Sequence, residues 1–197
     1  MGVILLEIEL LEPSLKGTVS LEECIVKRES VRSFKDKGVE TEKLSQLLWA
    51  GQGKKGYKKT VPSAGGTYPL ELYVVIKDRG IFHYDSNNNK LISVKEGNFG
   101  KALARASLDQ MFIFEAPINI VICADFNRTC GRYGNRGVRY VFMEIGHCAQ
   151  NIELEAVALG LDSVPIGAFH DDDVKKILGL SKNIDPLYII PVGYKKK

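Results

Sequence analysis

The chain has few of the residues that build metal sites, disulfide scaffolds or reactive thiol centres. Its 197 residues include four cysteines and three histidines, and no two cysteines form a C-x-x-C pair. His147 and Cys148 are adjacent, so on a helix their side chains would point about a hundred degrees apart and could not easily share one ion. Zinc sites need close pairs of such ligands. We therefore interpret the cysteines as structural or incidental and expect no bound metal.

The chain also lacks a large charge excess and a long apolar run. Its 27 basic and 24 acidic side chains leave a net charge of +3, which is too small to indicate a nucleic acid or an anionic membrane as the partner. No window approaches the roughly eighteen uninterrupted apolar residues of a membrane helix. Residues 1–11 carry Glu7 and Glu9 instead of the basic start of a signal peptide. We therefore expect a cytoplasmic protein with no membrane and no nucleic-acid partner.

The residues that are present predict one α+β domain over residues 1–197. The hydrophobic fraction is 45%, and no repeat, linker or change of composition divides the chain. β-Branched and aromatic content predicts strands at 71–77, 81–85, 91–95, 118–124 and 187–192. Helical spacing predicts helices at 21–28, 41–51, 99–109, 138–159 and 171–178. Ser20 is the predicted cap of the first helix and Asp171 that of the last.

The longest predicted element, the helix at 138–159, is apolar on more than one side. Its main apolar stripe has helical spacing, and Tyr140, Met143 and Leu154 add apolar groups outside that stripe. A helix of this kind needs cover on more than one side. It is therefore the central helix of the domain, or it also meets a second subunit. A stripe that faces a cofactor is a third interpretation.

One glycine motif suggests nucleotide binding but has the wrong surroundings. Residues 51–56 match G-x-G-x-x-G, yet a predicted helix precedes them where the dinucleotide fingerprint needs a strand. Tyr57 follows the last glycine where a phosphate loop of the Walker type needs lysine. We predict a flexible, solvated loop over 51–60, which could lie over an active site. A second interpretation is a nucleic-acid-binding module that uses Lys54, Lys55, Lys58 and Lys59.

Three other segments have the chemistry of a ligand site. Arg28, Ser30 and Arg32 place two guanidinium groups and a hydroxyl within five residues, which suits a phosphate monoester. Residues 62–69 are mostly small and precede a predicted strand, so a ligand can approach their backbone closely. Residues 160–169 end in small residues whose backbone N–H groups are free to donate.

In order and spacing, these segments resemble the nitroreductase-like FMN-dependent oxidoreductase family, and within it the branch of SagB-type dehydrogenases that form azoles from azolines. The resemblance spans about residues 20 to 194. The matching motifs are 28–32, 62–71, 133–140, 146–151, 159–161, 165–169 and 190–193.

The resemblance implies an α+β fold with a mixed central sheet flanked by helices, in an intertwined homodimer that holds two FMN molecules at its interface. It assigns the FMN phosphate and ribityl chain to Arg28, Ser30 and Arg32 of one subunit. It assigns contacts from the partner subunit to the small-residue segment, at Pro62, Ser63, Ala64 and Gly66. The backbone beside the isoalloxazine would be that of Ile166, Gly167 and Ala168, with the N–H of Gly167 donated to flavin N5.

The resemblance further implies an oxidoreductase in which NAD(P)H reduces FMN and an organic acceptor, such as a nitroaromatic or a quinone, then takes the electrons. The flavin performs this chemistry, so no catalytic side chain is assigned. One alternative is an azoline dehydrogenase acting on a modified peptide; such enzymes use a Lys-Tyr pair, and this chain has Arg139 and Tyr140. Another is a flavin-binding protein without turnover. Many members of the family bring further basic residues to the phosphate after the last strand. Lys195 to Lys197 are one substitute for them, but we expect residues 195–197 to be frayed.

Overall fold

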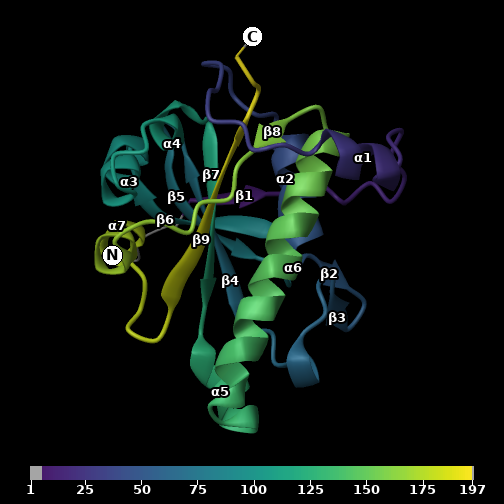
Figure 1. Ribbon diagram of the computed structural model, residues 1–197, viewed down its shortest axis with the longest axis vertical. Helices are drawn as coiled ribbons and strands as arrows, with labels where there is room; N and C mark the ends of the chain where they lie inside the picture. Colours follow the sequence, from purple (N-terminus) through teal and green to yellow (C-terminus); the bar gives the residue numbers. More distant parts are fainter. Residues whose placement is uncertain (1–5, 197) are drawn as a thin grey trace.

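A seven-stranded sheet runs through the middle of the molecule, and helices cover both of its faces (Figure 1). The computed structural model describes residues 6–196, so Lys197 and the first five residues of the segment 1–11 lie outside the described residues. The strands are β1 (Glu7–Glu9), β4 (Leu70–Ile76), β5 (Gly80–Asp85), β6 (Lys90–Glu96), β7 (Ile118–Ala124), β8 (Asp162–Ser163) and β9 (Asp185–Gly193). Their order across the sheet is β1-β6-β5-β4-β7-β9-β8.

The ladders between these strands are antiparallel, and the sheet is mixed only through one isolated parallel bridge, between Ser30 and Ser163. The central strands β4 and β7 are apolar along almost their whole length, because both faces of the sheet are covered. Alternate residues of β4 enter two different cores, with Leu72 on one face and Tyr73 on the other.

Two helical layers provide these cores (Figure 1). On one face, α2 (Thr41–Gln52) and the 23-residue helix α6 (Arg136–Ala158) pack on the sheet, and α1 (Leu21–Lys27) packs on α6. On the other face lie α3 (Gly100–Ala106), α4 (Phe112–Glu115) and α7 (Asp171–Leu178). The remaining helix, α5 (Phe126–Tyr133), packs against the start of α6. No helix within residues 6–196 is long and apolar enough to cross a bilayer.

The structure confirms the predicted α+β class and the main elements, with several corrections. Ser20 does cap α1, where its hydroxyl accepts the N–H of Glu23 at 3.2 Å. The predicted loop at 51–60 contains a short hairpin, β2 (Lys54–Lys55) and β3 (Lys58–Lys59). The helix at 99–109 ends at Ala106, and α4 and α5 were not predicted. The N-cap of α7 is His170, so the prediction for Asp171 was wrong.

The last described residues are held in place, which corrects the expectation of a frayed end. Lys195 forms an isolated bridge with Phe34. The N–H of Lys35 donates to the carbonyl of Tyr194 at 2.7 Å, and the N–H of Lys196 donates to the carbonyl of Ser33 at 3.1 Å. The end of the chain thus lies beside the segment that follows Arg32.

The close approach of α5 to α6 requires glycine at position 137. Gly137 is buried, and a Cβ atom there would lie 2.8 Å from both the backbone nitrogen and the Cα of Cys130. Backbone atoms cannot move aside as a flexible side chain can, so any larger residue separates the two helices.

We expect Gly137→Ala to destabilise the protein by about 1–3 kcal/mol, the usual cost of overpacking. This cost outweighs the gain of roughly 1 kcal/mol from alanine's better helix propensity. Gly131→Ala is the matched control, because Gly131 lies in α5 with open space around its Cα. The control should gain stability in chemical denaturation. Equal stabilisation by both substitutions would show that α5 and α6 are not in contact at Gly137.

Candidate functional site

The predicted phosphate-binding segment lies directly after α1, at the edge of the sheet. Arg28 is the C-cap of α1, and its N–H donates to the carbonyl of Cys24. Ser30 then forms the parallel bridge with Ser163 of β8, and the N–H of Val31 donates to the Ser163 carbonyl at 3.0 Å. This pairing fixes the segment beside the chain that continues into Ile166.

The backbone at 166–168 provides free donors at the same edge. Ile166 exchanges two backbone hydrogen bonds with Ile189 of β9, at 2.8 and 3.0 Å. The backbone pairing with β9 stops at this residue. Gly167 and Ala168 are exposed, and within the described chain neither donates its N–H to a backbone carbonyl. The structure therefore brings together the first and third predicted groups of site residues within one chain.

The charges at this edge are partly paired. The Nη1 of Arg28 lies 3.6 Å from Oε1 of Glu153, whose side chain is only 6% exposed. Burial raises the pKa of Glu153, and the nearby guanidinium opposes that shift. Glu29 pairs with Lys195, whose ammonium lowers the Glu29 pKa through a hydrogen bond. Arg32 is exposed and has no carboxylate within 4.0 Å among the described residues, so its guanidinium is free to bind an anion.

The small-residue segment forms a rigid loop elsewhere on the molecule. The hydroxyl of Ser63 accepts the N–H of Tyr68 at 2.9 Å, across the 3₁₀ turn η1 (Ala64–Gly66). Gly65 has a φ of +59°, and a Cβ atom there would lie 2.6 Å from the hydroxyl of Tyr133. The positive φ therefore favours glycine at position 65, while the Tyr133 hydroxyl, at the end of a flexible side chain, could shift to admit a Cβ atom.

Helix α5 holds this loop through side chains that the sequence did not reveal. Arg128 and Arg132 donate to the carbonyls of Tyr68 and Gly65, at 3.0 and 3.1 Å. A third contact joins the hydroxyls of Thr67 and Thr129 at 2.8 Å. One local signal for this helix exists in the sequence, because Asp125 caps α5 directly after the buried strand β7.

A buried carboxyl group lies behind the loop and was also missed. Glu144 of α6 is 3% exposed, and its Oε1 has no hydrogen-bond partner among the described residues. Burial raises the pKa of Glu144 to about 7, although the Ser63 hydroxyl and the Gln52 side chain oppose the shift. This carboxyl is therefore close to half protonated near neutral pH. Nothing in its position on an amphipathic helix distinguishes it from an exposed glutamate.

Helix α6 separates the two halves of the candidate site. Glu144, behind Ser63, and Glu153, beside Arg28, are nine residues apart on the same helix. Nine residues correspond to about 13 Å along the axis and about half a turn around it. The loop at 62–66 and the segment at 28–32 thus lie on opposite sides of α6 and toward opposite ends. One chain does not bring them together.

A groove of about 980 Å³ lies between residues 11–21, α2 and the C-terminal half of α6. None of the ten predicted site residues lines it. Six of those ten residues are exposed, three are half-buried, and Ile166 is buried.

The arrangement of sheet, two helical layers and a long central helix is that of the nitroreductase fold. The chain belongs to the Nitroreductase family, whose model matches residues 25–194. It is 42% identical over 185 residues to a Methanocaldococcus jannaschii protein provisionally named as a nitroreductase, covering 90% of this chain and 92% of that one.

A Bacillus subtilis protein named FMN reductase [NAD(P)H] is 26% identical to this chain over 181 residues, which cover 84% of this chain and 61% of that protein. A crystal structure from Ralstonia eutropha JMP134, provisionally described as a nitroreductase, has the same fold. Its TM-score is 0.86 at 24% identity, with coverage of 97% of this chain and 90% of that chain.

The raised pKa of Glu144 predicts a stability that falls with pH. Its folded-state value of about 7 lies above the ordinary value of 4.5. The stability that the buried, protonated Glu144 contributes is therefore fully present below pH 4.5. It is lost between pH 4.5 and 7, because over this range the unfolded chain releases the proton and the folded chain keeps it. We expect Glu144→Gln to remove this loss, which is on the order of 3 kcal/mol.

The measurement is the free energy of unfolding of both proteins from pH 4 to pH 8, at one protein concentration. Glu96→Gln, which changes an exposed carboxylate on β6, is the control and should follow the wild type. Parallel curves for wild type and Glu144→Gln would mean that this carboxyl is ionised throughout the range.

Proposed function

We propose that the protein is an FMN-dependent oxidoreductase that works as a homodimer with a single FMN-binding domain per chain. It passes a hydride from NAD(P)H through FMN to an organic acceptor such as a nitroaromatic or a quinone. The observation that carries this proposal is the placement of two sets of exposed donors and small residues on opposite sides of α6. Family membership supports the oxidoreductase class, and the name of the Bacillus subtilis relative supports FMN and NAD(P)H.

The residues at the 28–32 edge fit FMN by their donor chemistry. The exposed guanidinium of Arg32, with the hydroxyl of Ser30, offers charge-assisted hydrogen bonds to a phosphate. Arg28 contributes a second guanidinium that Glu153 already holds in place. The free N–H groups of 167–168 lie farther along the same edge, where they can donate to the ring system. When FMN is bound, it supplies hydride transfer at its N5 atom.

The second half of the site comes from the partner subunit in this proposal. A two-fold axis across the middle of α6 exchanges its two ends and its two sides. Such an axis carries the loop at 62–66 of one chain to the 28–32 edge of the other. Each FMN is then held by Arg28, Ser30 and Arg32 of one subunit and by Pro62, Ser63, Ala64 and Gly66 of its partner.

The surface of α6 is suited to this dimer. Val138, Phe142 and Met143 are large apolar residues that remain exposed, and Gly146 lies on the same face with open space around its Cα. Apolar residues gathered on one helix face mark an interaction surface. A glycine at the centre of the face lets two helices approach closely. Leu21, Ile25 and Val26 of α1, which packs on α6, are also exposed apolar residues.

The side chains of this protein bind, orient and shield in the proposed reaction. With FMN bound, the Gly167 N–H would hold the ring in place, and the partner's loop at 62–66 would cover the site and exclude water. Behind this loop, the Ser63 hydroxyl stabilises the ionised form of the buried Glu144 carboxyl.

The function is tested by three measurements on the purified protein: FMN content, steady NAD(P)H oxidation with a quinone, and reoxidation of the reduced protein. We expect about one FMN per subunit and turnover that requires both substrates. FMN without turnover would favour a flavin-binding protein that is not an enzyme, and absence of FMN would overturn the proposal.

We expect FMN to bind more tightly than riboflavin, because riboflavin lacks the phosphate that Arg32 and Ser30 contact. Arg32→Ala should cost about 1.5–3 kcal/mol of FMN affinity, the range for hydrogen bonds to charged groups. The same substitution should leave riboflavin affinity unchanged, as measured by quenching of flavin fluorescence. Arg105→Ala, at an exposed position of α3, is the control. Equal affinities for the two flavins would show that the 28–32 edge does not bind the phosphate.

Gly146→Arg should break the dimer and lose FMN while the chain stays folded. The Cβ position meets no atom within 4 Å, and a helical residue other than glycine suits the isolated chain. Light scattering should report a monomer, with unchanged circular dichroism and an FMN content near zero. Ala102→Arg on α3 adds the same side chain to the opposite helical layer and should stay dimeric. A Gly146→Arg monomer that retains FMN would place the whole site within one chain.

A further inference from the structure

Two segments of the chain contain basic residues and no acidic residue. Residues 53–70 hold four lysines, and residues 126–143 hold four arginines. Together they carry a charge of +8 in a protein whose net charge is +3. The rest of the chain keeps 19 basic and 24 acidic side chains, and its net charge is therefore −5. The small net charge conceals a strong separation of charge.

The loop at 62–68 of the first segment lies against α5 of the second. Three contacts from α5 to the loop at 62–68 join them, through Arg128, Thr129 and Arg132. In Figure 1, α5 and the start of α6 lie at one end of the molecule, and the loop that follows β3 reaches the same end. We call the surface formed by residues 53–70 and 126–143 the basic pole.

Most charges of the basic pole are not neutralised. Arg128 pairs with Glu71 and Asp125. The other seven have no carboxylate within 4.0 Å in the part of the chain that the structure describes; they are Lys54, Lys55, Lys58, Lys59, Arg132, Arg136 and Arg139. Elsewhere eight lysines form ion pairs, while Arg32 and several other basic residues do not. The basic pole is distinguished by seven such cations in two segments that contain no acidic residue.

The hairpin of the basic pole places like charges opposite one another. Lys54 faces Lys59 across the two strands, and Lys55 faces Lys58. Like charges in these positions repel one another, and a bound anion would relieve that repulsion. Desolvation lowers the pKa of Lys59, the most buried of the four. The remaining three are exposed and available to a ligand.

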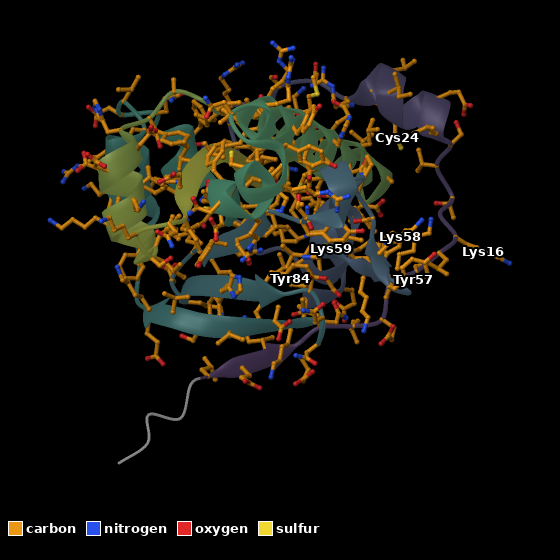
Figure 2. The ribbon with its side chains drawn as sticks, turned by 90° about the horizontal axis from the view of Figure 1, so that it is seen from below. Lys16, Cys24, Tyr57, Lys58, Lys59 and Tyr84 are labelled. Carbon is orange, nitrogen blue, oxygen red and sulfur yellow. The ribbon has the colours of Figure 1, made fainter. Side chains whose placement is uncertain are left out.

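An aromatic ring stands at the tip of the hairpin. Tyr57 is 91% exposed, and the ammonium of Lys58 lies 5.4 Å from the centre of its ring. Figure 2 shows Tyr57 and Lys58 toward the outer end of the hairpin and Lys59 closer to the body of the molecule. A ring face beside several free cations can stack a base while the cations bind the phosphates attached to it.

We propose that the basic pole binds the phosphates of the dinucleotide that donates the hydride, and that it selects the 2′-phosphorylated form. This inference rests on the proposed function, in which the loop at 62–66 reaches the partner's FMN and brings the basic pole beside that site. A phosphate monoester carries about −1.5 to −2 charges near neutral pH. The 2′-phosphate is the one group that distinguishes NADPH from NADH. Unpaired cations that bind this group therefore favour NADPH.

The test measures the dissociation constants of NADP⁺ and NAD⁺ on the FMN-loaded protein by calorimetry. We expect NADP⁺ to bind about tenfold more tightly than NAD⁺ at low salt, with the difference shrinking as ionic strength rises. The double variants Lys55→Gln/Lys58→Gln and Arg136→Gln/Arg139→Gln should each weaken NADP⁺ binding about fivefold or more and leave NAD⁺ binding nearly unchanged. Lys101→Gln/Arg105→Gln removes two exposed charges from α3 and should bind both ligands like the wild type.

Equal binding of NADP⁺ and NAD⁺, or variants that bind NADP⁺ as the wild type does, would overturn this inference. So would a short DNA duplex that binds more tightly than NADP⁺ and is released by the same substitutions, because the basic pole would then serve a nucleic acid. FMN content and reoxidation of the dithionite-reduced protein by a quinone involve no dinucleotide, and both should be unchanged in the variants. A protein that passes these two measurements but does not prefer NADP⁺ refutes only the inference, whereas a protein without FMN refutes the proposed function.

Discussion

Two buried carboxyl groups on α6 set the positions of the segments that form the candidate site. A buried carboxyl is costly unless polar groups or an opposite charge face it. Glu153 is faced by Arg28 at the end of α1, and Glu144 is faced by Ser63 and Gln52. Each pairing fixes one segment against one side of the helix. The half-turn between the two carboxyls therefore becomes the separation between the two halves of the site.

The sequence predicted the elements whose apolar pattern is long or continuous. β7 was predicted with its observed bounds, 118–124, because a strand buried on both faces is apolar at every position. The hairpin of β5 and β6 followed from the turn residues 86–89 between two strand-like runs. α6 begins two residues earlier than predicted because Arg136 and Gly137 add nothing to the apolar stripe. The two segments that meet at the sheet edge were also identified, but the bridge between Ser30 and Ser163 was not.

The features that the sequence did not reveal depend on contacts between distant residues. α5 is largely polar, so from the sequence its arginines are expected to be solvated surface charges. In the structure two of them bind the loop at 62–68. Glu144 and Glu153 lie outside the main apolar stripe of α6, where the sequence predicts exposed side chains. They are buried because residues far away in the chain cover them. The final residues looked frayed because their partners, residues 33–35, lie more than 150 positions earlier.

The hairpin of β2 and β3 forms a two-stranded sheet of its own, separate from the seven-stranded sheet. No side chain of residues 54–59 belongs to either hydrophobic core. Its base is closed by one bond from the Thr60 N–H to the Gly53 carbonyl at 3.0 Å, and a longer contact runs from Lys59 to the Tyr68 hydroxyl. Insertions, deletions and new sequences in this hairpin therefore carry little penalty for folding. Sequence changes here can therefore remodel this surface while the two cores beneath it stay the same.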